Sequence, residues 1–143
     1  MQIDLFQEQD FIGHSGDKLT WKIEMDAISY TEWKCIAKMI LPYTQYTPFR
    51  EVLGIPRGGK ILADILQKDS SGNPSDPYLI VDDVLTTGGS MSEFKNTNPI
   101  VQGKDCIGWV VFARVRPPSW VNALFQMPRK WVDNPNNPVY MKD

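Results

Sequence analysis

Two short segments of the chain combine glycines with charged side chains, a pattern typical of phosphate binding. In the first segment, Asp82 and Asp83 follow the apolar run 78–81 and precede a turn rich in threonine, glycine and serine. The glycines allow a tight turn whose N–H groups point inward, and the hydroxyls add donors at the start of a following helix. A phosphate monoester fits this turn, which we assign to Val84, Leu85, Thr86, Thr87, Gly88, Gly89 and Ser90.

The second segment is another glycine-rich turn, and it carries two cationic side chains. It follows the short apolar stretch 51–55 and precedes a predicted helix. Backbone N–H groups together with an arginine and a lysine suit a pyrophosphate, although solvated basic residues at a glycine-rich helix start would give the same pattern. The candidate pyrophosphate-binding residues are Pro56, Arg57, Gly58, Gly59 and Lys60.

An apolar strand, two acidic residues and a Thr/Gly/Ser turn together resemble the signature of the type I phosphoribosyltransferases. The resemblance implies that Asp82 and Asp83 hold the ribose hydroxyls of phosphoribosyl pyrophosphate (PRPP) and that residues 84–90 surround its 5′-phosphate. It also implies that the turn at Arg57 binds the leaving pyrophosphate. The implied activity is Mg²⁺-dependent transfer of ribose 5-phosphate to a nitrogenous base, with Mg²⁺ held mainly through substrate oxygens and by the two aspartates. Asp82, Asp83 and Arg57 are the candidate catalytic residues.

The second turn also comes close to the P-loop of nucleoside triphosphatases. Gly54, Gly59 and Lys60 have the spacing of that motif, and residues 79–82 could serve as its acidic strand. A P-loop needs a hydroxyl side chain after the lysine to bind Mg²⁺, and this chain has Ile61 there. A triphosphatase is therefore the less favoured alternative.

The identity of the base is a weaker prediction. Residues 11–18, followed by 21–26, resemble the hood of orotate phosphoribosyltransferases, where a Ser-Gly pair lies in the base-binding segment. A lysine commonly precedes that pair, and His14 stands there in this chain. The candidate base-binding residues are His14, Ser15, Lys18 and Arg114, and the accepted base is orotate or another pyrimidine or purine.

The connection before the acidic strand is short for this family. Members usually have a long loop there that closes over the reaction and excludes water, whereas this chain has only residues 67–77. Two classes of function therefore stay open: a phosphoribosyltransferase, and a ligand sensor that keeps the fold and the phosphate site without efficient catalysis.

Length and composition fit one domain, residues 1–143, with 42% hydrophobic residues and a formal charge of −2. That charge gives no reason to expect nucleic acid or an anionic membrane as a partner. Cys35 and Cys106 show no Cys-x-x-Cys pattern, and no apolar run has membrane-spanning length, so we expect a cytoplasmic protein. The resemblance implies a homodimer.

The periodicity predicts an α/β domain whose parallel sheet lies between helices in three layers. We place its core at about residues 50–115 and a small hood at about 1–30 and 114–132. In the predicted helix 59–67, Ile61, Leu62, Ile65 and Leu66 face the sheet. The other predicted elements are a strand at 19–25, a helix capped by Ser29 and ending at Pro42, a strand at Val52, a loop at 69–77, a helix near 90–95, a strand at 107–113, a short helix at 120–125 and a surface tail at 134–138.

Overall fold

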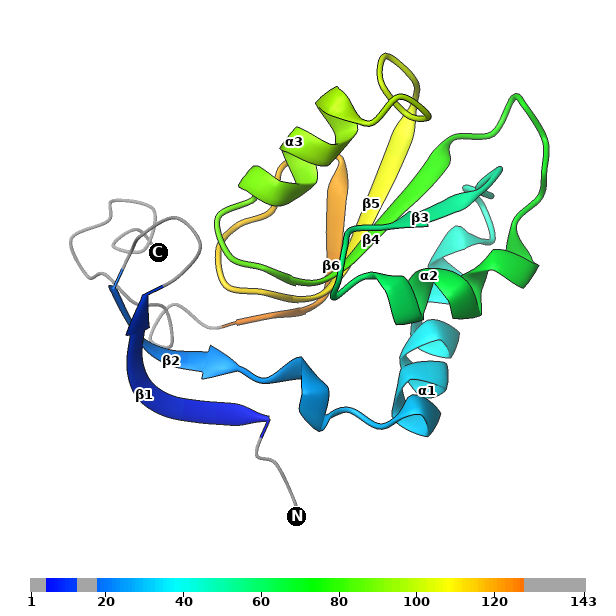
Figure 1. Ribbon diagram of the computed structural model, residues 1–143. Helices are drawn as coiled ribbons and strands as arrows, with labels where there is room; N and C mark the ends of the chain where they lie inside the picture. Colours follow the sequence, from blue (N-terminus) through cyan, green and yellow to red (C-terminus); the bar gives the residue numbers. More distant parts are fainter. Residues whose placement is uncertain (1–4, 13–17, 128–143) are drawn as a thin grey trace.

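The computed structural model describes residues 5–12 and 18–127, and its main feature is a four-stranded parallel sheet. The strands lie in the order β3-β4-β5-β6, and every neighbouring pair is parallel. Two further strands, β1 and β2, form a separate antiparallel pair (Figure 1). The strands are β1 (Phe6–Ile12), β2 (Lys18–Ile23), β3 (Val52–Gly54), β4 (Tyr78–Leu85), β5 (Cys106–Ala113) and β6 (Val121–Gln126).

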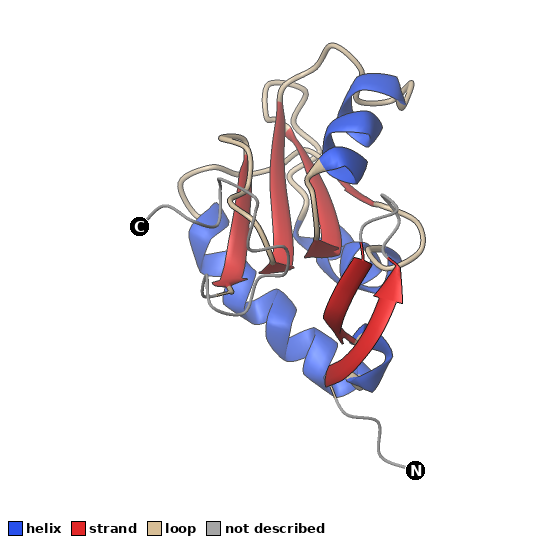
Figure 2. Cartoon of the chain, turned by 90° about the vertical axis from the view of Figure 1, so that its left-hand side faces the viewer, coloured by secondary structure: helices blue, strands red, loops and turns tan. Residues whose placement is uncertain are grey.

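Helices cover both faces of the parallel sheet. The helices α1 and α2 pack on one face and α3 packs on the other, which gives three layers (Figure 1; Figure 2). This arrangement confirms the predicted α/β fold class. The helices are α1 (Tyr30–Ile40), α2 (Lys60–Leu66) and α3 (Gly89–Thr97), with short 3-10 helices η1 (Met25–Ala27), η2 (Leu41–Thr44) and η3 (Gln67–Asp69).

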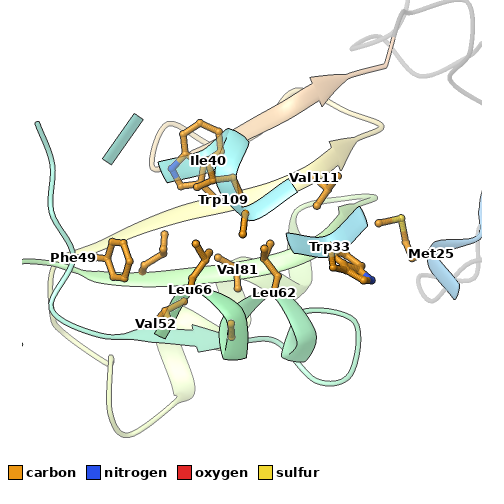
Figure 3. Packing of buried hydrophobic residues seen from close by; sticks show 13 residues of the cluster. Met25, Trp33, Ile40, Phe49, Val52, Leu62, Leu66, Val81, Trp109 and Val111 are labelled. Atoms are coloured by element: carbon orange, nitrogen blue, oxygen red, sulfur yellow. The ribbon is translucent and has the colours of Figure 1, made fainter. Parts of the chain in front are cut away.

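The larger hydrophobic core lies between the sheet and the helices α1 and α2 (Figure 3). Leu62 and Leu66 of α2, Ile40 of α1 and Val81 of β4 have no exposed surface, and Trp33 is only 3% exposed. Burying a side chain of this size contributes roughly 1.5–3 kcal/mol, so these contacts hold α2 firmly against β4. The turn before α2 is thereby held beside the end of β4.

The start of α1 follows the sequence prediction. The Ser29 hydroxyl accepts a hydrogen bond from the Glu32 N–H at 3.2 Å, and the Glu32 carboxylate accepts one from the Ser29 N–H at 2.9 Å. This reciprocal capping box satisfies two N–H groups that a helix start leaves without intrahelical partners.

One residue of the predicted apolar face of α2 points elsewhere. Ile61 is 44% exposed and lines a pocket, whereas Ala63 is buried against the sheet. Helical periodicity gives the direction of a side chain but not how far the sheet extends beneath it. Ile61 lies in the first turn of α2 and borders the pocket at the end of the sheet.

The prediction of a short helix at residues 120–125 is wrong. Residues 121–126 form β6, which pairs with β5 from Gly108 onward and is the edge strand of the parallel sheet. The predicted hood segment 114–132 therefore contributes a strand to the main sheet. Residues 114–120 connect two parallel strands, and no helix lies in this connection.

The N-terminal segment forms a β-hairpin. The predicted strand at 19–25 is present as β2, although it ends at Ile23 and is followed by η1. Its partner β1 was not predicted from the sequence. The two strands pair from Phe6 with Ile23 to Ile12 with Lys18.

The connection from α2 to β4 lies at the amino edge of the sheet, where β3, β4 and β5 begin. The Ser71 N–H donates to the Phe49 carbonyl at 2.8 Å, and the Gly72 N–H donates to the Arg50 carbonyl at 3.0 Å. Both acceptors precede β3. Because the strands are parallel, this connection lies at the opposite edge from the carboxyl ends of β3 and β4. Residues 67–77 therefore do not cover Asp82 and Asp83.

Candidate functional site

The two predicted carboxylates lie in the second half of β4, near the carboxyl edge of the sheet, where β3, β4 and β5 end. Asp82 is buried at 8% exposure, and Asp83 is half-buried. Each carboxylate accepts a hydrogen bond from the N–H of the next residue, Asp82 from Asp83 at 2.8 Å and Asp83 from Val84 at 2.7 Å. These local bonds orient both side chains before any ligand arrives.

Burial changes the acidity of Asp82. Desolvation, and to a lesser extent the neighbouring charge of Asp83, raises the pKa of Asp82 from 3.8 to about 8. Near neutral pH Asp82 is therefore mostly protonated, and a ligand that brings positive charge or hydrogen-bond donors would favour its ionised form.

The turn after β3 packs against β4 so closely that it requires glycine. A Cβ on Gly54 would overlap the Gly59 backbone, and a Cβ on Gly59 would overlap the carbonyl of Val81. A Cβ on Gly58 would overlap the Asp83 carboxylate. The glycines therefore bring this turn into contact with the acidic part of β4.

The hydrogen bonds of this turn leave two N–H groups for a ligand. The Gly59 N–H donates to the Ile55 carbonyl at 2.8 Å and closes the turn. Among the described residues, the N–H groups of Arg57 and Gly58 donate to no backbone carbonyl. The peptide bond between Pro56 and Arg57 is cis.

The turn after β4 leads into α3, as predicted. Gly88 is the N-cap of this helix and has a φ of 86°, a conformation that favours glycine. The Gly89 N–H donates to the Thr87 hydroxyl at 3.2 Å. Among the described residues, the N–H groups of Thr86, Thr87 and Gly88 donate to no backbone carbonyl. Together with the first turn of α3, these groups form a cluster of donors suited to an anion.

A pocket of about 720 Å³ connects these features. It brings together eight of the predicted residues of the two turns and β4, namely Pro56, Arg57, Gly58, Asp82, Asp83, Val84, Thr86 and Ser90. Arg114, a predicted base-binding residue, also lines it and is only 4% exposed. The full lining is Ile23, Glu24, Met25, Asp26, Trp33, Ile55, Pro56, Arg57, Gly58, Ile61, Asp82, Asp83, Val84, Thr86, Ser90 and Arg114.

Several predicted site residues do not line this pocket. Leu85 is buried in the core beneath α3, and Lys60 is exposed at the start of α2. Thr87, Gly88 and Gly89 belong to the turn that leads into α3 and are not part of the lining. His14 and Ser15 lie outside the described residues, and Lys18 is described only as the first residue of β2.

Sequence reasoning missed the part of the lining formed by residues 23–26. Glu24 and Asp26 are polar members of the alternating pattern that runs from Leu19 to Asp26, which indicated a solvated face. Because the alternating pattern continues through Met25, it gave no sign that the strand ends at Ile23.

Two further results concern metals and membranes. Among the described residues, no group of three or more His, Cys, Asp or Glu side chains could hold a metal ion. In the same part of the chain, no helix is long and apolar enough to cross a membrane.

The sequence matches no protein-family model and no curated protein. Solved structures do share its fold, and several of them are phosphoribosyltransferases. The orotate phosphoribosyltransferase from Aeropyrum pernix has a TM-score of 0.65 and 16% identity, over 86% of this chain and 88% of that one. At this identity the likeness establishes the fold, and it confirms the predicted structural resemblance to the type I phosphoribosyltransferases.

Two other similar structures contain bound ligands. The orotate phosphoribosyltransferase of Mycobacterium tuberculosis in complex with PRPP has a TM-score of 0.61 and 15% identity, over 79% of this chain and 84% of that one. The APRTase from Giardia lamblia, complexed with 9-deazaadenine, has a TM-score of 0.60 and 13% identity, over 83% of this chain and 93% of that one.

Proposed function

We propose that this protein transfers ribose 5-phosphate from PRPP to a nitrogenous base, orotate or another pyrimidine or purine, with release of pyrophosphate. The observation that carries the proposal is the contact between the Gly58 turn and the Asp83 carboxylate within one pocket. This contact places a candidate pyrophosphate turn beside a candidate sugar-binding pair. To bind PRPP, the pyrophosphate turn and the sugar-binding pair must lie within the length of one ribose of each other.

The sugar and its 5′-phosphate would occupy β4 and the turn that follows it. Asp83 would accept a hydrogen bond from one ribose hydroxyl. Asp82, whose pKa is raised by burial, would accept one from the other hydroxyl once the bound ligand and Mg²⁺ favour its ionised form. The 5′-phosphate would bind the N–H groups of residues 86–88 and the hydroxyls of Thr86 and Ser90. These charge-assisted bonds would fix the sugar relative to the sheet.

The leaving group would bind the turn after β3. As the bond from the ribose carbon C1 to pyrophosphate breaks, the electron pair leaves with the pyrophosphate and C1 becomes cationic until the base nitrogen bonds to it. The Arg57 guanidinium and the N–H groups of Arg57 and Gly58 would stabilise the growing negative charge. The two carboxylates would hold the cationic sugar in place.

The chemistry of the donors fits Mg²⁺ as a cofactor held partly by substrate. Mg²⁺ prefers oxygen ligands and retains several waters, so it needs only one or two carboxylates from the protein. Asp82 and Asp83 supply such carboxylates, and the described residues offer no closed metal cage. When bound, Mg²⁺ would neutralise charge on the pyrophosphate.

The experiment is pyrophosphate release from PRPP and Mg²⁺ with orotate, uracil, adenine, guanine, hypoxanthine or xanthine. We expect release with at least one base and its loss in the Asp82→Asn/Asp83→Asn double variant. Asp64→Asn is the matched control, because Asp64 is an exposed carboxylate of α2 that does not line the pocket. Release that persists in the double variant would contradict the proposed roles of the two aspartates.

A second candidate function has its own structural support. The connection 67–77 lies at the amino edge of the sheet, so it cannot exclude water from the pocket as the family's long loop does. A site without such a cover suits a sensor that binds PRPP or a nucleotide without efficient transfer. Binding of PRPP that depends on Asp82 and Asp83, with no release for any base, would favour this function.

The resemblance also suggests a cytoplasmic homodimer, and we propose the dimer as the form that acts. Sedimentation equilibrium of the full chain would test it, because a monomer at micromolar concentration would rule out a stable dimer.

A further inference from the structure

One part of the pocket lining has no role in the proposed binding of PRPP. In that proposal, β4 and the turn after it bind the sugar and the 5′-phosphate. The turn after β3 binds the pyrophosphate. The remaining continuous segment is residues 23–26, which connects β2 to η1. Because the incoming base must reach the ribose carbon that the pyrophosphate leaves, it has to lie in the same pocket beside the sugar.

Two acidic residues of this segment, Glu24 and Asp26, line the pocket. Glu24 is half-buried, and its Oε1 accepts a hydrogen bond from the Asp26 N–H at 3.3 Å, which caps η1. Glu24 has further partners in the protein, whereas the Asp26 side chain is exposed. Met25, between them, is buried in the core and anchors the segment. Asp26 is therefore the more accessible acceptor of a segment held in a fixed position.

Ionised carboxylates accept hydrogen bonds and donate none. A base that presents an exocyclic amino group to this segment would be complementary to it, because the amino group donates hydrogen bonds. A base that presents a carboxylate or a carbonyl oxygen would face a like charge or a second acceptor, which is a common basis for rejecting a ligand.

Arg114 is the lining residue that would attract an acidic base instead. Its side chain is 4% exposed, and it already has interaction partners within the protein. An acidic base would have to compete with those partners, whereas a base with N–H donors would not. The accessible charge on this side of the pocket is therefore the negative charge of residues 23–26.

We propose that residues 23–26 form the base-facing wall, and that Asp26, supported by Glu24, selects bases with an exocyclic amino group over bases with an oxo group at the same ring position and over acidic bases. This inference rests on the proposed phosphoribosyl transfer. It favours adenine-type and guanine-type bases over orotate, hypoxanthine and xanthine.

The test compares pairs of bases that carry an amino or an oxo group at the same ring position, the oxo member also having a hydrogen on the adjacent ring nitrogen. Adenine and hypoxanthine form one pair, guanine and xanthine form another, and orotate is the acidic probe. We expect the wild type to prefer the amino member of a pair by about tenfold or more in kcat/KM. Asp26→Asn should lower that preference about tenfold with the KM for PRPP unchanged, because the amide can donate to an oxo group.

Two further variants complete the experiment. Glu24→Gln keeps the acceptor oxygen that caps η1 but removes the charge, so it should lower the preference while the fold is retained. Asp64→Asn should leave the preference unchanged. A preference for orotate or for the oxo member would overturn the inference and leave the proposed function standing, as would a preference unaffected by both Asp26→Asn and Glu24→Gln. Absence of release with every base would instead overturn the proposed function, and the inference with it.

Discussion

The two edges of the parallel sheet are built from similar residues but differ in where their hydrogen bonds go. At the amino edge, residues 70–77 contain glycine, serine and aspartate, and their polar groups bind one another and the residues before β3. The Ser71 hydroxyl, for example, donates to the Asp76 carboxylate at 2.6 Å. At the carboxyl edge, the N–H groups of residues 57–58 and 86–88 donate to no backbone carbonyl among the described residues.

This difference shows how one composition gives either a closed loop or a binding site. The amino-edge loop satisfies its own polar groups, so a ligand has little to add. The carboxyl edge holds its glycines against β4, and Arg57, Gly58, Asp82 and Asp83 line one pocket there. Changes at the carboxyl edge should therefore affect binding and catalysis, and changes at the amino edge should affect stability alone.

The largest effect is expected from Asp83→Asn. The variant keeps the shape of the side chain but removes the charge that would hold the cationic sugar. We expect pyrophosphate release to fall at least about a hundredfold, which corresponds to about 2.7 kcal/mol of transition-state stabilisation. The circular dichroism spectrum should stay unchanged, and wild-type turnover in this variant would contradict the proposed site.

Gly58→Ala should weaken PRPP binding. The added methyl group would overlap the Asp83 carboxylate, which must then move away from its position beside the turn. We expect the dissociation constant for PRPP, measured by calorimetric titration, to rise about tenfold or more, or at least about 1.4 kcal/mol. Unchanged affinity would show that the contact between turn and carboxylate is unimportant for binding.

The pH dependence of stability should report the burial of Asp82. Its pKa is raised from the ordinary 3.8 to about 8 in the folded protein. At a pH between these two values, the native state therefore keeps a proton on Asp82 that the unfolded chain has released. Stability from this group is therefore present below about pH 4, falls as the pH rises towards 8 and is constant above that.

Urea denaturation of the wild type and of Asp82→Asn would measure this effect. From about pH 5 to about pH 8, we expect the wild type to lose stability relative to the variant by about 1 kcal/mol or more. A difference that stays constant over this range would show that Asp82 ionises normally in the folded protein.

Gly72→Ala is the amino-edge counterpart and should have the smallest effect. Gly72 has a φ of 69° and open space around its Cα, so alanine would suffer only backbone strain. We expect a loss of about 1 kcal/mol in the free energy of unfolding and no change in PRPP affinity. A marked loss of PRPP affinity would mean that the two edges are not independent.

The sequence was sufficient for the elements that have strong local signals. The apolar run before Asp82, the glycines of both turns and the capping box at Ser29 each specify their structure with few alternatives. The parallel sheet and the placement of the acidic pair at its carboxyl edge follow from these elements.

The parts that could not be predicted depend on long-range packing. The segment from Val121 to Gln126 is a partly exposed edge strand, and its short, mixed pattern also fits a helix. The exposure of Ile61 depends on where the sheet ends beneath α2. Glu24 and Asp26 line the pocket because β2 ends at Ile23 and η1 turns the chain, which strand alternation alone does not indicate.

The most direct test of the central claim is calorimetric titration of the full chain with PRPP and Mg²⁺, using the wild type, Asp82→Asn/Asp83→Asn and Asp64→Asn. If the carboxyl edge binds PRPP, the wild type and Asp64→Asn will bind it with equal affinity and the double variant will not bind measurably. Equal binding by all three proteins, or by none of them, would contradict the assignment of this pocket to PRPP.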